Sequence, residues 1–317
     1  MRRRIPAVLA VLGLSALTLA GCATASSPAA CARPAADTGV LDAVHVSGAP
    51  GAAQVSLDAP VFVPETVAED ETVGEGMAIT SDAQDLAFSV TIVDGATGES
   101  LLSAGPQVNT VGYWREHYDG LADMMMCARE GSRVVGAVPA TALSTDAAQN
   151  WGLSEDDTIV VAMDVQKVYH LAAANGVPQY NDRRGMPSVV LAPGGEPGII
   201  MPDADPPADL AVEVLKKGDG AVVTDADSIR IKYTGVTWAD RKVFDSSWQK
   251  GASVAVTMNG VVPGFAQALE GQTVGSQILA VIPPELGYGA EGSGTIPGDA
   301  TLVFVIDILG IDAPASS

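Results

Sequence analysis

The chain reads YTG at 233–235, VFDSS at 243–247, VVPGF at 261–265, LGYGA at 286–290 and ATLVF at 300–304. Phe, Trp and Tyr make up only 5% of the 317 residues, yet each of these five short segments carries an aromatic side chain. Aromatic side chains gathered from several segments, with an acidic residue among them, are typical of an apolar ligand pocket with a few polar groups. The last third of the chain is therefore where we look for a functional site.

The pattern around these segments predicts an antiparallel sheet with one short helix. Four stretches alternate or run apolar and β-branched, as half-buried strands do: 228–234, 252–258, 277–282 and 301–309. Pro263 suits a first helical turn, and Phe265 and Leu269 would then share one helix face. Gly271 can end that helix. The expected fold class is α+β, a twisted antiparallel sheet wrapped around a short α-helix.

The five segments, in this order and spacing, resemble the FKBP-type peptidyl-prolyl cis-trans isomerases over about residues 207–312. The resemblance implies an isomerase domain at 207–317 that acts on proline-containing polypeptides and can bind macrolide inhibitors. Rotation about an amide bond breaks no covalent bond, so no metal or other cofactor is expected. The alternative is a chaperone or scaffold that binds proline-containing segments without catalysis. A solute-binding lipoprotein fits poorly, because the strand-rich pattern does not supply two α/β lobes.

The resemblance also assigns roles to individual residues. It implies three catalytic groups: the Asp245 carboxylate, the Tyr288 hydroxyl and the backbone N–H of Val262. It implies the substrate-binding positions Tyr233, Phe244, Val254, Val261, Phe265, Ile296 and Phe304. Several features depart from the family: Phe265 stands where Trp is usual, and Val254 and Val256 stand where Phe is common. The loop before Val261 and the segment after Tyr288, called the flap, are both short. Taken singly, each aromatic residue could instead be a core residue, and Asp245 a turn cap.

The N-terminal half looks like a worn copy of the C-terminal half. Residues 121–125, 131–139 and 157–165 match 265–269, 275–283 and 300–308 at a constant offset of 143 to 144 residues. In this alignment Leu121 replaces Phe265, Ser144 replaces Tyr288 and Val161 replaces Phe304. We therefore expect two modules of the same fold, with residues 40–175 forming a degenerate copy that has no catalytic pocket. Its Met124, Met125 and Met126 are expected to be helix residues packed in a core, with an adaptable binding patch as the alternative.

A stretch rich in Pro and Gly at 176–206 is expected to be a linker between the two modules. Within it, residues 188–191 and 198–201 are apolar and extended in character. We expect them to add edge strands to the second sheet.

The N-terminus has the pattern of an export signal. Arg2, Arg3 and Arg4 precede an apolar run at 5–19, and Leu19-Ala20-Gly21-Cys22 resembles the lipobox of bacterial lipoproteins. We expect removal of 1–21, lipid attachment at Cys22, a tether over 22–39, and a location on the outer face of the cytoplasmic membrane. The lipid anchor would be the only membrane contact. An ordinary secretory signal with an incidental Cys is the alternative.

The cysteines, the histidines and the net charge indicate which disulfide, metal site or nucleic-acid partner to expect. If Cys22 carries lipid, Cys31 and Cys127 remain, and an oxidising compartment favours a disulfide between them, two free thiols being the alternative. The three His residues are isolated, so no metal site is expected. Residues 1–21 hold three Arg and no acidic residue, so their removal changes the net charge from −21 to −24. A chain this acidic is not expected to bind nucleic acid.

Overall fold

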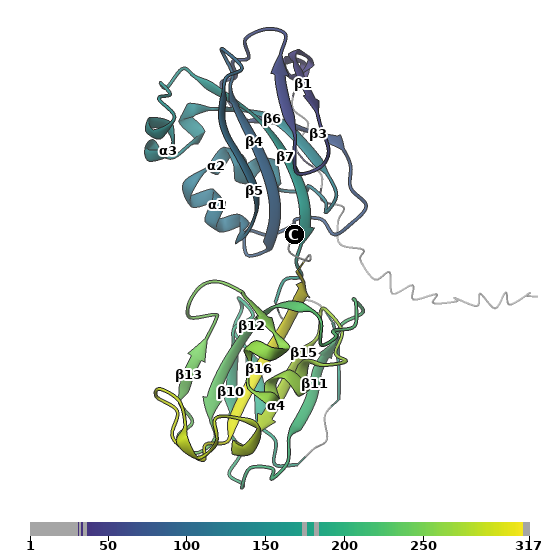
Figure 1. The fold of residues 1–317 in the computed structure, drawn as a ribbon, viewed down its shortest axis with the longest axis vertical. Coiled ribbons are helices and arrows are strands. Elements are labelled where there is room, and N and C mark those ends of the chain that lie inside the picture. The colour runs from purple at the N-terminus through teal and green to yellow at the C-terminus, as the bar shows by residue number, and fades with distance from the viewer. Residues whose placement is uncertain (1–30, 32, 34–36, 173–175, 181–183, 313–317) are drawn as a thin grey trace, which may run out of the picture. The chain divides into compact units, whose positions relative to one another are not determined.

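The computed structural model of the protein describes residues 31, 33, 37–172, 176–180 and 184–312 (Figure 1). The expected signal segment, the expected lipidation site Cys22 and most of the expected tether lie outside these residues. We call residues 37–172 the N-terminal module and residues 176–312 the C-terminal module. Within the described residues, no helix has both the length and the apolar character needed to cross a membrane.

An antiparallel sheet of seven strands forms the C-terminal module, in the order β13-β12-β16-β15-β11-β8 with β14 also paired to β12. Its strands are β8 (Val177–Pro178), β11 (Ala211–Lys217), β12 (Ser228–Thr237), β13 (Val243–Ser246), β14 (Val254–Thr257), β15 (Gln277–Ile282) and β16 (Leu302–Ile311). Helix α4 (Pro263–Leu269) packs on one face of this sheet, and short 3-10 helices lie at Met258–Gly260, Pro284–Leu286 and Gly289–Glu291. The four predicted strands, the predicted helix and the α+β class are confirmed.

Helix α4 is held by the residues that the sequence indicated. Pro263 is its first residue, and Phe265 and Leu269 are both buried in a core formed with β12, β15 and β16. The helix ends at Leu269 with Glu270 as its C-cap, and Gly271 follows with a φ of 74°, a left-handed conformation that glycine adopts without strain. Because Phe265 and Leu269 are packed in this core, the N-terminus of α4 is fixed beside the sheet.

The other face of the same sheet is covered as well. Strands β9 (Ser188–Leu191) and β10 (Pro197–Ile200) pair only with each other, as an antiparallel hairpin. Val189 and Ile199 of this hairpin pack against a second buried cluster that includes Leu279 and Val303. The prediction that these residues add edge strands was wrong, because their apolar side chains are used to cover a sheet face. The stretch 176–206 is accordingly more than a linker.

The N-terminal module has the same architecture. Its main sheet has the order β3-β6-β7-β4-β5, and a separate hairpin of β1 and β2 packs on one face of it (Figure 1). The strands are β1 (Val44–Ser47), β2 (Gln54–Leu57), β3 (Val67–Thr72), β4 (Asp85–Asp94), β5 (Ser100–Thr110), β6 (Arg133–Pro139) and β7 (Thr158–Val168). The helices are α1 (Val111–His117), α2 (Asp119–Met125) and α3 (Thr145–Asn150), with 3-10 turns at Gly39–Ala43 and Ala140–Ala142.

The two modules share an antiparallel main sheet, one core helix and a hairpin behind the sheet. Helix α2 takes the place of α4, and its Met124 and Met125 are fully buried in the module core, which confirms the core interpretation for this pair. Met126 lies just past the helix end and packs against the same core while remaining partly exposed. The hairpins correspond too, since Ser188 follows Val44 by 144 residues and Pro197 follows Gln54 by 143. The repeat therefore includes the hairpin that covers the back of each sheet.

Cys31 and Cys127 are disulfide-bonded in the structure. Cys127 follows α2 and has a φ of 67°, which is uncommon for a residue other than glycine. We expect a preparation with Cys22→Ser to contain no free thiol when it is denatured without reductant and titrated with a thiol reagent. The same sample after reduction should give two thiols and serves as the control. Two thiols before reduction would contradict the disulfide.

Candidate active site

A pocket of about 510 Å³ opens in the C-terminal module between α4, the sheet and the loops that follow β14 and β15. Its lining consists of Tyr233, Phe244, Asp245, Val254, Val256, Asn259, Gly260, Val261, Val262, Phe265, Tyr288 and Phe304. Nine of the ten site residues expected from the sequence are therefore brought together. We call this cavity the C-terminal pocket.

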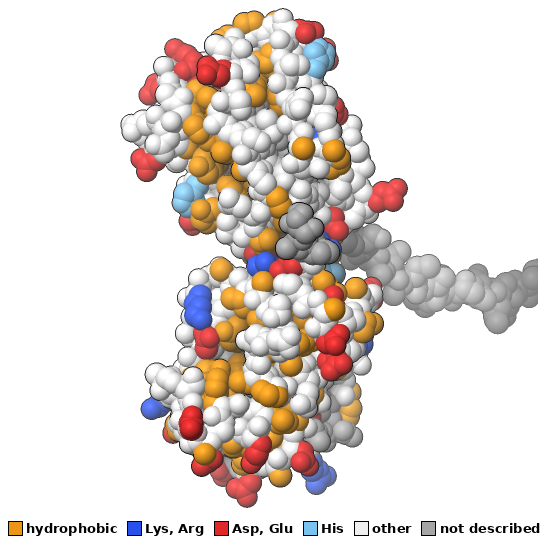
Figure 2. Space-filling model, in the orientation of Figure 1, with side chains coloured by type: hydrophobic (Ala, Val, Ile, Leu, Met, Phe, Trp, Pro, Cys, Tyr) orange, Lys and Arg blue, Asp and Glu red, His pale blue; other side chains and the backbone are white. Residues whose placement is uncertain are grey.

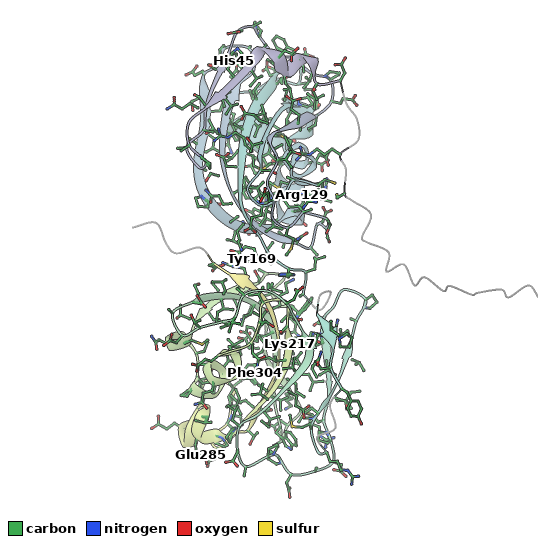
Figure 3. The ribbon with its side chains drawn as sticks, turned by 90° about the vertical axis from the view of Figure 1, so that its right-hand side faces the viewer. His45, Arg129, Tyr169, Lys217, Glu285 and Phe304 are labelled. Carbon is green, nitrogen blue, oxygen red and sulfur yellow. The ribbon has the colours of Figure 1, made fainter. Side chains whose placement is uncertain are left out.

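Phe304 stands at the centre of the aromatic lining. It lies on β16, in the interior of the module (Figure 3), and only 5% of its surface is exposed. Its ring packs edge-on against Phe265 at 4.9 Å and against Phe244 at 5.4 Å between centroids. Tyr233 lies 6.1 Å from it. Edge-to-face packing of this kind fixes ring orientation, so the apolar walls keep their shape without a ligand.

Gly235 on β12 makes room for two of these rings. A Cβ atom at this position would lie 2.7 Å from the ring atoms of both Phe244 and Phe304. No such contact is tolerated without moving a neighbour, and the neighbours here are rings already packed against each other. The glycine of the YTG segment is thus a requirement of the aromatic box.

Asp245 is held by two donors at the mouth of the pocket. The Tyr233 hydroxyl donates to its Oδ2 at 2.6 Å, and Lys250 Nζ lies 2.5 Å from its Oδ1. Burial alone would raise the pKa of the Asp245 carboxyl, but the hydrogen bonds from Lys250 and Tyr233 hold this pKa below its usual range. Burial and the bond to Asp245 raise the pKa of Tyr233. Near neutral pH the pair is consequently an ionised carboxylate and a protonated phenol.

The polar edge of the pocket is built from backbone and one hydroxyl. Val262 is the N-cap of α4, and its carbonyl accepts hydrogen bonds from the N–H groups of Phe265 and Ala266. Because its own N–H precedes the helix, the intrahelical pattern does not use that donor. Tyr288, with 39% of its surface exposed, carries a second donor of the lining in its hydroxyl group. An extended peptide in the pocket would thus meet two donors for its carbonyl oxygens.

Ile296 does not line the pocket. Its side chain is buried in the core cluster that includes Phe265 and Leu302. Its backbone pairs with that of Ser293 within the flap, the segment that follows Tyr288. An apolar side chain on a short flap is better placed inward than over an open pocket. The expectation that Ile296 contacts substrate is corrected in this respect.

The lining also includes groups that the sequence did not single out as site residues. Asn259 and Gly260 come from the 3-10 turn after β14. Val256, which the sequence comparison placed with Val254 at the pocket mouth, also lines the pocket. Lys250, the partner of Asp245, was not anticipated either. A cation five residues after an acid in a turn is a common surface pattern, so no sequence signal separated it from other lysines. In the described residues, no group of three or more His, Cys, Asp or Glu is arranged to hold a metal ion.

An apolar aromatic box with two hydrogen-bond donors for substrate carbonyl groups and a fixed carboxylate is a site of the peptidyl-prolyl isomerase class. The family model for the FKBP-type peptidyl-prolyl cis-trans isomerase matches residues 220–309. A probable FK506-binding protein of Corynebacterium glutamicum is 35% identical over 114 residues, which are 36% of this chain and 97% of that protein. An FK506-binding protein of Streptomyces anulatus is 33% identical, over 37% of this chain and 97% of its own length.

Among solved structures, the crystal structure of FkpA from Escherichia coli is 31% identical, with a TM-score of 0.33. That likeness covers 43% of this chain and 55% of FkpA. The sequence relatives, by contrast, are matched over nearly their full length. The chain belongs to the FKBP-type peptidyl-prolyl cis-trans isomerase family.

Proposed function

We propose that this isomerase assists the folding of exported proteins at the outer face of the cytoplasmic membrane, to which lipid on Cys22 tethers it. The observation that carries the proposal is the joint presence of the aromatic box around Phe304 and the Tyr233–Asp245 pair. The lipobox-like segment at 19–22 supports the location. The names of the two FK506-binding relatives support a further proposal, that the C-terminal pocket also takes macrolides of the FK506 type.

The pocket can catalyse rotation by favouring the twisted amide. An X-Pro bond rotates over a barrier of roughly 18–20 kcal/mol, because resonance is lost when the amide leaves its plane. In the proposed complex the rings of Phe265 and Phe304 hold the pyrrolidine ring away from water. The Val262 N–H and the Tyr288 hydroxyl bind the flanking carbonyls, and the Asp245 carboxylate supplies a fixed local field. Each interaction accelerates rotation only as far as it is stronger in the twisted state.

Removing one polar group should lower catalysis more than stability. We expect Tyr288→Phe and Asp245→Ala each to slow isomerisation by about one to two decades, since a lost transition-state interaction costs roughly 1–3 kcal/mol. Tyr288 is exposed at the pocket mouth and Asp245 lies at the module surface, so the midpoint of thermal unfolding should change little. A protease-coupled assay on a prolyl peptide measures the rate.

Matched controls are Tyr180→Phe, at a tyrosine with 92% of its surface exposed, and Asp225→Ala, at an exposed aspartate outside the pocket. Both should turn over like the parent. If Asp245→Ala and Tyr288→Phe do so as well while still binding peptide, the assigned roles fail. A module that binds proline-containing segments without these groups in catalysis would then be the better description.

The lipid anchor is tested separately. When the chain is expressed with its N-terminal signal in a bacterium that processes lipoproteins, we expect it in the membrane fraction. Cys22→Ser should move it to the soluble extracytoplasmic fraction, because the protein would lose its acyl chains. Cys31→Ser is the matched control and should leave the protein with the membrane. Membrane association that survives Cys22→Ser would contradict the lipid anchor.

A further inference from the structure

The N-terminal module has an apolar cleft of its own, with a volume of about 210 Å³. The side chains that shape it include Phe88, Leu102, Tyr113, Trp114, Tyr118 and Trp151. Two of them reach the surface, since Tyr113 is 43% exposed and Leu102 is 36% exposed. Figure 2 shows a band of hydrophobic side chains on this face of the module, with acidic side chains at its border. We call this cavity the N-terminal cleft.

The cleft occupies the place in this module that the C-terminal pocket occupies in the other, but its aromatic residues come from different positions. Leu121, which lines the cleft, corresponds to Phe265, and Val90 on β4 corresponds to Tyr233 on β12. Apart from Phe88 on β4, the rings come from α1 and from the segments beside α2 and α3. Tyr118 stacks on Trp151 with centroids 5.9 Å apart. The aromatic lining was thus rebuilt from other elements while the concave face of the sheet was kept.

The rebuilt lining has lost the polar groups that the isomerase mechanism uses. Val90 has no hydroxyl in place of that of Tyr233, and the turn that follows β4 contains no Phe-Asp pair. No carboxylate is among the residues that line the cleft. Such a site can bind an apolar group by burial alone, but it has no carboxylate whose electrostatic field would stabilise a twisted amide.

Size and charge indicate what the cleft can take. A volume of about 210 Å³ is below the range of roughly 300–1,000 Å³ for small-molecule sites, and suits a single apolar or aromatic side chain. Residues 37–170 contain 21 acidic and only four basic residues. Glu116 on α1 is exposed next to the cleft residues of that helix. The potential around the cleft therefore favours a positively charged partner.

We propose that the N-terminal cleft holds an apolar or aromatic side chain of an extended, Lys- or Arg-rich segment of non-native polypeptide, without isomerising it. The site is distinct from the C-terminal pocket and does not require proline. The two modules would accordingly bind different features of one client chain.

The test uses the full chain and a fluorescein-labelled, proline-free peptide, Gly-Lys-Ser-Phe-Ser-Lys-Gly, with fluorescence anisotropy at physiological salt. We expect saturable binding, and weakening by about tenfold or more in Tyr113→Ala and in Leu102→Ser, since each removes an apolar contact at the mouth. Both residues are partly exposed, so the fold should persist, and an unchanged circular dichroism spectrum and thermal unfolding profile of the full chain verify this. Phe62→Ala, at a 54% exposed phenylalanine of the same module outside the cleft, is the matched control.

Four results would overturn the proposal. The first is equal binding of the peptide in which Gly replaces Phe, which would show attraction by charge alone. The second is displacement by an excess of prolyl peptide, which would place the binding in the C-terminal pocket. The third is a Tyr113→Ala effect that only follows a change in the oligomeric state, measured by sedimentation, which would make the cleft a contact between copies. Unweakened binding in both cleft variants would overturn it equally.

Discussion

Residues 176–317 alone are expected to retain the full isomerase activity of the protein, whereas residues 28–175 are expected to fold and show none. The C-terminal fragment keeps every pocket residue together with the hairpin β9–β10 and the edge strand β8. The N-terminal fragment keeps its own core around α2, but it has Leu121 and Val161 where the pocket has Phe265 and Phe304.

The protease-coupled assay on the two fragments and the full chain measures this difference. A third fragment, 207–317, provides a structural control, because it lacks the hairpin and exposes the cluster around Leu279 and Val303. Exposing apolar surface costs about 25 cal/mol per Å². We expect this fragment to unfold at a lower denaturant concentration than 176–317. Turnover by 28–175 at a rate comparable to that of 176–317 would refute the assignment of isomerase activity to the C-terminal module alone.

Phe304→Ala should damage stability and catalysis together. The ring is almost fully buried and contacts three other aromatic rings, so its loss leaves a cavity in the core as well as a gap in the pocket wall. Truncation of a buried Phe typically costs about 3–5 kcal/mol. A large part of the usual stability of a domain would be lost, and the aromatic box would no longer be fixed.

Denaturant unfolding of residues 176–317 and peptide turnover at a temperature where both proteins are folded separate the two effects. Phe304→Leu keeps most of the volume and should restore much of the stability but less of the activity, because an aliphatic side chain cannot give edge-on ring contacts. Tyr180→Ala, at an aromatic residue of the same fragment with 92% of its surface exposed, is the matched control. A folded Phe304→Ala protein with parental turnover would show that the ring serves only the core.

The sequence predicted the elements whose pattern is local. Apolar and β-branched runs predicted strands β12, β14, β15 and β16. Pro263, with Phe265 and Leu269 on one face, predicted α4. Most of the pocket lining could be predicted as well, because the aromatic residues are rare and their spacing resembles that of a known family. In these cases the local preference and the tertiary environment agree.

The misses have a common physical origin, since each depends on a choice that the local pattern leaves open. The apolar residues of β9 and β10 could pair at a sheet edge or lie flat on a sheet face, and only the apolar surface around Leu279 decides between these. The side chain of Ile296 could point toward the pocket or into the core, and it packs in the core. The aromatic residues of the N-terminal cleft lie on β4, on α1 and beside α2 and α3, all outside the repeated blocks. An alignment of the two halves therefore showed what had been lost and not what had been gained.

The hairpin behind each sheet bears on the ancestry of the chain. Because the repeat of 143 to 144 residues includes the hairpin as well as the main sheet and its helix, the duplicated segment was a complete folding unit with both sheet faces covered. A gene duplicated in this way yields a second copy that is soluble from the first generation. Selection could then change the pocket of one copy residue by residue while the other kept the original chemistry.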